Sequence, residues 1–214
     1  MTRSAVSKPQ RRTQEQRSAE TRVRLLDATI ECLVEYGYAG TTTPRVAERA
    51  GVTRGAQVHH FGSKTDLVVA AISHLAQRRT EAAMQEIGRV RAGGDPLGTA
   101  LEFMWELHQG PLFIAAIELW VASRTDPVLA VEMEKVEPYV NNAVLLAVAQ
   151  LVPNEMHRKN VRDFAYTAMD TLRGILVTNF ISPDPARAHR RWQRASAQLN
   201  LVAKTVMPDL SVAD

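Results

Sequence analysis

Hydrophobic residues recur every three or four positions from residue 19 onward, which is the period of an amphipathic α-helix. In the first such segment Leu26, Ile30 and Leu33 share one face, and Gly37 stands where this helix is expected to end. The later segments keep this period and contain no convincing run of the alternating pattern that marks a strand. The pattern therefore predicts an all-α protein.

Two short helices are predicted next. Thr42 followed by Pro44 is typical of an N-cap with proline in the first turn, and this helix is expected to end near Ala50. Thr53 is placed to cap a second short helix that ends near His60. A tight turn joins the pair.

Capping residues, glycines and prolines delimit the other helices. Ser63 with Asp66 three residues later resembles a capping box and opens a long helix. The linker RAGGDP at 91–96 and four later breaks that contain proline separate the rest. The predicted helices after His60 are 63–90, 96–108, 112–124, 127–151, 154–180 and 184–207. The chain thus contains about nine helices, a small front and a larger carboxy-terminal bundle.

Charge is distributed unevenly between these parts. The 214 residues include 26 Lys+Arg and 23 Asp+Glu, yet residues 1–65 hold 11 basic and 6 acidic side chains while residues 66–214 hold 15 and 17. This asymmetry suggests that the front meets a polyanion. We expect a disordered basic arm at 1–17, a small unit at 18–75 that meets the polyanion, and a larger unit at 76–214.

Composition narrows the class of protein. The single cysteine, Cys32, excludes an internal disulfide and is expected to be a small core residue in a reducing compartment. The longest apolar run is interrupted by Glu118, so no membrane-spanning helix is predicted. The amino terminus lacks the apolar segment of a secretory signal. A cytoplasmic protein without membrane contact is expected.

The segment TTTPRVAERAGVTRGAQVHHFGSK, residues 41–64, has the helix lengths and the glycine turn of a helix-turn-helix. The second helix of this motif lies in the major groove of DNA, where arginine pairs with guanine and glutamine with adenine. Arg54 and Gln57 are therefore candidate base readers. The candidate DNA-binding residues are Thr42, Thr43, Arg45, Thr53, Arg54, Gly55, Gln57, His59, His60 and Lys64.

Residues 21–68 resemble the amino-terminal domain of the TetR family of bacterial transcriptional regulators. The matching positions are Arg22, Leu25, Leu26, Ala28, Gly37, Thr42, Val46, Ala47, Ala50, Gly51, Val52, Thr53, Gly55, His60, Phe61, Ser63, Lys64 and Leu67. The resemblance implies a homodimer that binds a palindromic operator on double-stranded DNA, usually represses transcription, and releases DNA when a small ligand enters the larger domain. It therefore implies a DNA-binding unit at 18–75 and a ligand-binding and dimerisation unit at 76–214. Where the family most often has Leu-Tyr, this chain has Gln57-Val58, so His59 or the basic arm is expected to replace the phosphate contact of that tyrosine.

Candidate effector-binding residues gather in the middle of the chain. Ligand pockets are mostly apolar, with a few placed polar groups. The candidates are His74, Met104, Trp105, His108, Phe113, Ile117, Trp120, Asn141 and Phe164. Each of them is equally well explained as part of the hydrophobic core.

The last two predicted helices carry small and apolar residues at three- and four-residue intervals. Two such helices from each subunit would form a four-helix interface, and the family resemblance implies the same. The candidate interface residues are Ala168, Thr171, Gly174, Ile175, Thr178, Leu199, Val202 and Val206. The alternative for each stripe is the core of the chain itself.

Together these patterns predict a repressor that a small apolar or amphipathic effector releases from its operator. A related activator or an effector-insensitive regulator is the alternative. A helical enzyme that uses His108, Glu118 or Asp163 is the distant rival, because no nucleophile-base set or phosphate loop is found. His59 and His60 point about 100° apart on a helix and have no ligand partner at a suitable spacing, so neither a metal nor a cofactor is expected.

Overall fold

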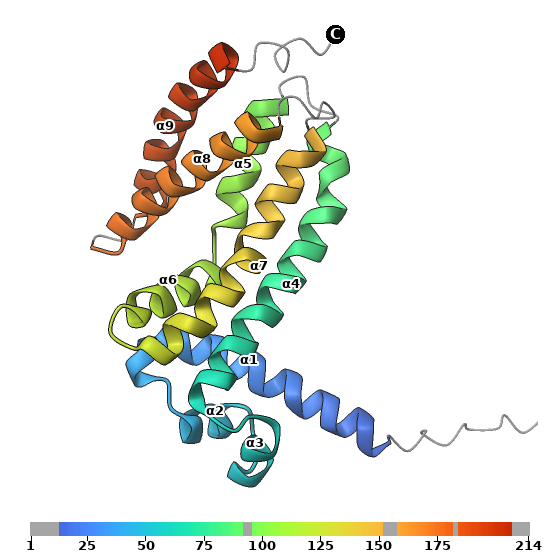
Figure 1. The fold of residues 1–214 in the computed structure, drawn as a ribbon. Coiled ribbons are helices and arrows are strands. Elements are labelled where there is room, and N and C mark those ends of the chain that lie inside the picture. The colour runs from blue at the N-terminus through green and yellow to red at the C-terminus, as the bar shows by residue number, and fades with distance from the viewer. Residues whose placement is uncertain (1–12, 92–95, 152–157, 182–183, 207–214) are drawn as a thin grey trace, which may run out of the picture.

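The computed structural model describes residues 13–91, 96–151, 158–181 and 184–206, and all regular secondary structure in these ranges is helical (Figure 1). The helices are α1 Gln14–Gly40, α2 Thr43–Arg49, α3 Arg54–His60, α4 Lys64–Arg91, α5 Pro96–Leu107, α6 Pro111–Ser123, α7 Pro127–Leu151, α8 Arg158–Asn179 and α9 Pro185–Val206. This confirms the all-α prediction. The short helices α2 and α3 lie at the end of the molecule opposite α9.

Helix α1 begins earlier than the hydrophobic pattern predicted. Thr13 and Gln16 form a capping box, in which each side chain accepts a hydrogen bond from the backbone N–H of the other residue. Residues 14–17, assigned from the sequence to a disordered arm, are therefore helical, whereas residues 1–12 lie outside the described ranges. The error arose because a cap fixes a helix start without apolar residues.

Gly37 interrupts α1 as predicted, although helical structure resumes to Gly40. Its φ of 66° is left-handed, a conformation that glycine adopts without steric cost. A Cβ atom at this position would lie 2.8 Å from the Glu118 Oε2 atom of α6. Glycine thus allows the end of α1 to approach α6 closely.

The predicted caps of the next three helices are confirmed. Thr42 accepts a hydrogen bond from the Arg45 N–H at the start of α2, and Thr53 accepts one from the Ala56 N–H at the start of α3. Ser63 accepts one from the Asp66 N–H ahead of α4. Each cap satisfies a backbone donor that the first turn of a helix leaves unpaired.

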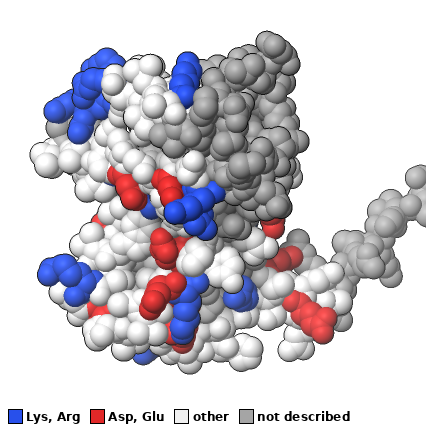
Figure 2. All heavy atoms as spheres, turned by 45° about the horizontal axis from the view of Figure 1, so that its top comes forward, with Lys and Arg blue, Asp and Glu red and all other residues white. Residues whose placement is uncertain are grey.

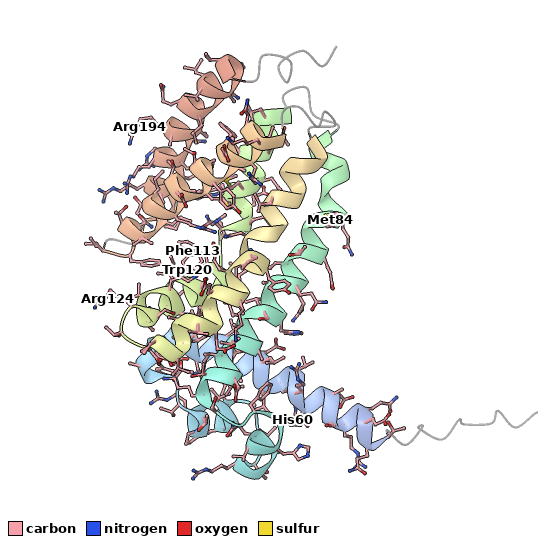
Figure 3. The ribbon with its side chains drawn as sticks, in the orientation of Figure 1. His60, Met84, Phe113, Trp120, Arg124 and Arg194 are labelled. Atoms are coloured by element: carbon pink, nitrogen blue, oxygen red, sulfur yellow. The ribbon has the colours of Figure 1, made fainter. Side chains whose placement is uncertain are left out.

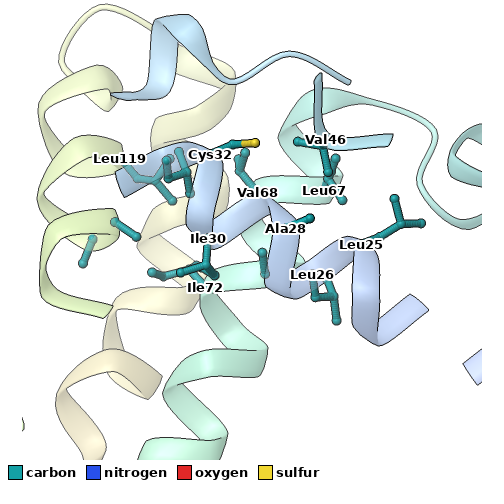
Figure 4. Close-up of a cluster of buried hydrophobic side chains, with 14 of the residues drawn as sticks. Leu25, Leu26, Ala28, Ile30, Cys32, Val46, Leu67, Val68, Ile72 and Leu119 are labelled. Carbon is teal, nitrogen blue, oxygen red and sulfur yellow. The ribbon is translucent and has the colours of Figure 1, made fainter. Parts of the chain in front are cut away.

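A front cluster of buried side chains joins α1, α2, α4, α6 and α7 (Figure 4). It is mainly aliphatic and includes Leu26, Leu33, Val46, Leu67 and Leu119. Cys32 is fully buried here, which agrees with the expected core role, and this burial raises the pKa of its thiol. One packed core therefore connects the helix-turn-helix with helices more than fifty residues further along the chain.

A rear cluster joins α5, α6, α8 and α9 and contains more aromatic and sulfur-bearing side chains. Trp105, Phe113, Met169 and Trp192 are its largest members. Helices α8 and α9 run side by side, and Trp192 of α9 is completely buried. The rear cluster holds the carboxy-terminal helices on the frame formed by α5 and α6.

Candidate nucleic-acid interface and buried cavity

Helix α3 presents one polar, accessible face. Arg54, Gly55, Val58 and His59 are exposed, and the Thr53 cap fixes the start of the helix. A Cβ atom on Gly55 would meet only the Thr53 hydroxyl, at 3.9 Å, so this part of the surface is open. A short, capped helix with such a face has the form that a major-groove reader requires.

The prediction that Gln57 reads a base is wrong for this structure. Its side chain is 2% exposed and its Nε2 donates a hydrogen bond of 3.1 Å to the Phe61 carbonyl oxygen. This contact holds the carbonyl at the end of α3 that the helix leaves without an internal partner. Gln57 is a structural residue because its position on the helix faces the core.

Sequence reasoning missed Val58, whose side chain is 56% exposed beside His59. An apolar side chain at this position suits contact with a thymine methyl group in the major groove. The sequence spacing does indicate this, because Val58 lies four residues after Arg54 and therefore on the same side of the helix.

The residues predicted to meet phosphates flank α3. Thr42, Thr43 and Arg45 are at least partly accessible. Arg45 donates to the Gly40 carbonyl oxygen and lies over the Tyr36 ring, with its Cζ atom 4.3 Å from the centroid. These contacts orient the guanidinium and leave further N–H groups for a phosphate.

Lys64 is less free than the sequence suggested. It is half-buried, and its Nζ donates a 2.6 Å hydrogen bond to the Tyr38 carbonyl oxygen and lies 3.8 Å from the Tyr38 ring centroid. Burial lowers the pKa of Lys64. An ammonium group has three donors, so a phosphate contact remains compatible with the bond to Tyr38.

His60 lies at the end of α3, far from the α8 and α9 helices (Figure 3). It is half-buried, and its ring lies 6.3 Å from the Phe61 ring between centroids. Burial, followed by the nearby His59 and Arg22, lowers the pKa of His60. The accessible His59 is therefore better placed than His60 for DNA.

A cavity of about 30 Å³ lies where the front and rear clusters meet. Three predicted effector-binding residues, His108, Phe113 and Trp120, line it. Phe113 and Trp120 lie near the middle of the molecule (Figure 3). Arg79 of α4 and Arg173 of α8 also line the cavity, and sequence reasoning missed both. For Arg173 a signal existed in the sequence, because a charged residue stands there between the apolar positions of a helix.

The structure does not bring the other effector candidates to this cavity wall. Met104 and Trp105 are buried in the rear cluster, and Ile117 and Phe164 pack against it. Asn141 is buried and binds the side chains of Glu137 and Arg173. His74 lies in a separate surface groove with Arg22 and Tyr139.

His108 is the buried titratable histidine of the cavity. Its Nδ1 lies 2.8 Å from the Met104 carbonyl oxygen. Burial lowers the pKa of His108 to about 4, with the nearby charges of Arg173 and Arg79 acting in the same direction. The ring is therefore neutral near pH 7 and carries its proton on Nδ1, where the carbonyl accepts it.

Two polar contacts link the cavity helices to the helix-turn-helix. The Glu118 Oε2 atom of α6 accepts a 3.2 Å hydrogen bond from the Tyr38 N–H, so Glu118 has a structural partner in the last turn of α1. The Tyr38 hydroxyl donates to the Asp126 carboxylate, 3.1 Å away, while Lys64 holds the Tyr38 carbonyl. A movement of α6, or of Asp126 ahead of α7, would thus act on the end of α1 and, through Lys64, on the start of α4.

The predicted dimer stripe is only partly on the surface. Ala168 and Ile175 belong to the rear cluster and Leu199 packs against it, because this face of α8 and α9 holds the two helices on their own chain. Thr171 is half-buried, Gly174, Thr178 and Val202 are exposed, and the side chain of Val206 lies outside those described. The accessible apolar side chains on these helices are Tyr166, Val177, Leu201 and Val202, followed along the chain from α8 by Phe180 and Ile181.

The space-filling view in Figure 2 shows basic and acidic side chains interspersed over the middle and lower part of the face that it displays. No helix in the part of the chain that the structure describes is long and apolar enough to cross a membrane. No set of three metal-ligating side chains converges among the described residues either.

Fold and site together define an all-helical protein with an amino-terminal helix-turn-helix and an internal cavity in a larger bundle. The model of the bacterial regulatory proteins of the tetR family matches residues 25–71. The HTH-type transcriptional regulator CymR of Pseudomonas putida is 30% identical over 185 residues, which cover 85% of this chain and 90% of that protein. The HTH-type transcriptional repressor AcnR of Corynebacterium glutamicum is 28% identical over 153 residues, 71% of this chain and 77% of AcnR. The chain belongs to the TetR family.

Solved structures share the fold. A TetR family member from Streptomyces coelicolor A3 superimposes with a TM-score of 0.59 at 21% identity, covering 84% of this chain and 98% of that one. The multidrug binding protein EbrR, in complex with ethidium, gives a TM-score of 0.60 at 20% identity with the same two coverages. The likeness extends beyond the helix-turn-helix to the carboxy-terminal bundle.

Proposed function

We propose that this protein is a homodimeric transcriptional repressor that binds a palindromic operator and is released from it by a small apolar or amphipathic effector. The accessible face of α3, formed by Arg54, Gly55, Val58 and His59, is the observation that carries the proposal. The curated relatives are named as transcriptional regulators, and AcnR as a repressor. Membership of this family gives the rival enzyme function no support.

In this proposal α3 lies in the major groove and Arg54 donates to a base edge. Thr42, Thr43, Arg45 and Lys64 contact the adjacent phosphates. The two α3 helices of the dimer lie about 34 to 36 Å apart, one turn of DNA. Residues 18–75 form the DNA-binding unit and residues 76–214 the effector and dimer unit.

Binding of the full chain to its own upstream DNA tests the proposal, against a scrambled duplex of equal length, from about 50 to 200 mM salt. We expect at least a hundredfold preference for the upstream fragment, and a loss of that preference in Arg54→Ala. Arg124→Ala is the matched control, because it removes the same charge from an exposed site at the end of α6. Equal losses in both variants, or no binding at low salt, would contradict the proposal.

The cavity between α4, α5, α6, α7 and α8 is the proposed effector site. At about 30 Å³ it is far below the roughly 300 to 1,000 Å³ of pockets for drug-sized ligands, so an effector must bind a more open conformer. The contacts from Glu118 and Asp126 to Tyr38 carry the resulting movement to the helix-turn-helix. A ligand that saturates the protein without changing operator affinity would contradict release.

The proposed dimer interface is the outer face of α8 and α9, around Gly174, Val177 and Val202. A Cβ atom on Gly174 would meet nothing within 4 Å in its own chain, so the chain's own packing does not require glycine there. Small residues at helix interfaces permit close approach of a second chain. The exposed apolar residues beside Gly174 supply the area that association buries.

Sedimentation equilibrium of Val202→Glu tests this interface. The buried charge is expected to shift the protein toward monomer and to weaken operator binding. Val121→Glu on α6 is the matched control, because Val121 is 64% exposed and Val202 is 54% exposed. A dimer that persists in Val202→Glu and dissociates in Val121→Glu would place the interface elsewhere.

A further inference from the structure

The cavity wall carries positive charge that no carboxylate on that wall neutralises. Arg79 and Arg173 are the charged residues among the described side chains that line it, and the other lining residues apart from His108 are apolar. His108 is neutral near pH 7 and adds no charge. Burial lowers the pKa of both guanidiniums, which is the effect expected when a charge is removed from water.

Arg79 is fixed by helix α5. Its Nη1 donates to the Leu107 carbonyl oxygen at 2.9 Å and its Nη2 to the Gln109 carbonyl oxygen at 2.7 Å. The guanidinium thus caps the carboxy-terminal end of α5, where the partial negative charge of the helix favours a cation. Arg79 is a structural support that also makes the local potential more positive.

Arg173 has unused binding capacity. Its Nε is buried and has no hydrogen-bond partner among the described residues. One Nη donates to the Asn141 side chain, and the amide nitrogen of Asn141 donates in turn to the exposed Glu137. The other Nη lies 3.9 Å from the carboxylate of Asp170, whose side chain is 75% exposed. Both nearby carboxylates therefore lie outside the cavity wall. An unpaired buried donor of a charged group is costly until an acceptor reaches it.

The wall beside Arg173 is aromatic and aliphatic. The guanidinium lies over Trp120, with its Cζ atom 4.9 Å from the ring centroid, and Phe113 lies on the same cavity. A guanidinium binds a carboxylate strongly through paired, charge-assisted hydrogen bonds. The site thus joins a cationic anchor with an apolar surface.

We propose that the effector is an amphipathic monocarboxylate, aromatic or aliphatic, whose carboxylate binds Arg173 and whose apolar body lies against Phe113 and Trp120. This inference rests on the proposed function in one respect, namely that this cavity is the effector site. The present cavity, at about 30 Å³, has no room for a ring, since a cavity that binds benzene measures about 150 Å³. Lining side chains such as Phe113, whose ring contacts Phe180 and His108, must therefore move when the ligand binds.

Calorimetric titration of the full-length protein with three probes of one shape tests the charge requirement. Benzoate is anionic, benzamide neutral and benzamidine cationic, and octanoate, octanamide and octylamine form the matched aliphatic set. We expect each carboxylate to bind at least about tenfold more tightly than its neutral and cationic counterparts. Ethidium, the cation in the EbrR complex, is included as a cationic probe of larger size.

Arg173→Gln is expected to abolish the preference for the carboxylate, and Arg173→Lys to retain part of it. Arg162→Gln is the matched control, because it makes the same change on α8 at a side chain that is 60% exposed. Thermal unfolding of each variant verifies that it is folded. Three results would overturn the inference. The first is tighter binding of the amide, the amidine or ethidium than of the carboxylate. The others are an unchanged preference for the carboxylate in Arg173→Gln, and no carboxylate binding up to the solubility limit.

Operator binding is measured on the same samples by fluorescence anisotropy. Carboxylate binding that depends on Arg173 but leaves operator affinity unchanged would support the carboxylate site at Arg173 and contradict the proposed release. Release of the operator by a neutral or cationic compound alone would support the proposed release and contradict the carboxylate site at Arg173. The two proposals therefore fail in different measurements.

Discussion

The front and rear clusters differ in what they bury. The front cluster is mainly aliphatic, and its helices begin at Thr42, Thr53 and Ser63, whose side chains satisfy backbone donors. The rear cluster contains tryptophan, phenylalanine and methionine, and beside it lie the buried side chains of His108 and Asn141 and the side chain of Arg173, which is 16% exposed. The cavity lies where the two clusters meet, because Ala76, Leu112 and Ala116 of the front cluster and Phe113 of the rear cluster line it together. Opening of this cavity would therefore disturb both cores.

Trp192→Ala is expected to have the largest effect, because Trp192 is fully buried in the rear cluster. The loss of a buried tryptophan costs about 3 to 5 kcal/mol of unfolding free energy. Trp192→Phe is the matched variant. It keeps a ring and removes an indole N–H that has no partner among the described residues, so it should lose less than half as much. Urea unfolding at fixed protein concentration measures both, and equal losses would contradict this account of the rear cluster.

The pH dependence of stability is expected to reveal His108. Its pKa is about 4 in the folded chain against 6.5 unfolded, so the unfolded state binds the proton more readily between these values. The contribution of neutral, buried His108 to the unfolding free energy is complete above pH 6.5. It is lost as the pH falls toward 4 and amounts to roughly 3 kcal/mol. Unfolding free energies of wild type and His108→Gln should therefore converge on acidification. Parallel curves would show that His108 is not the cause.

Gln57→Ala distinguishes a structural residue from a base reader. We expect a loss of about 1 to 3 kcal/mol of stability, because the Phe61 carbonyl loses its donor. The ranking of operator variants should stay unchanged. Val58→Ala should instead keep stability and change the preference at one base position, as measured by binding to single-base variants of the operator. A changed ranking in Gln57→Ala would mean that its side chain leaves the core on DNA.

Thr53→Ala is expected to have the smallest effect, about 1 kcal/mol, because it removes one N-cap from α3. Thr53→Ser keeps the hydroxyl and should keep the stability. Chemical unfolding measures the difference, and DNA affinity compared at equal folded fraction separates the cap from a direct contact. A large loss of stability in Thr53→Ser would show that the methyl group of Thr53, and not its hydroxyl, stabilises the start of α3.

Local chemistry explains why the front of the molecule was predictable. A cap such as Thr42 acts on a donor three residues away, and Gly51 adopts a φ of 63° in the turn, so neither depends on distant parts of the chain. The start of α1 was misplaced because its capping box lies in a polar segment. The helix-turn-helix could therefore be recognised from sequence, while the orientation of Gln57 could not.

The sequence by itself determined the helical class, most helix limits and the family, since period, caps and turn residues are local properties. Only the tertiary structure decided which side chains face the core, a neighbouring helix or solvent. Ala168 and Ile175 share one stripe with Gly174 and differ in burial because α5, α7 and α9 pack against part of the α8 surface and leave the rest open. Arg79 and Arg173, 94 positions apart in the sequence, line one cavity because α4 and α8 both face it. Such convergence depends on long-range packing, which no local pattern encodes.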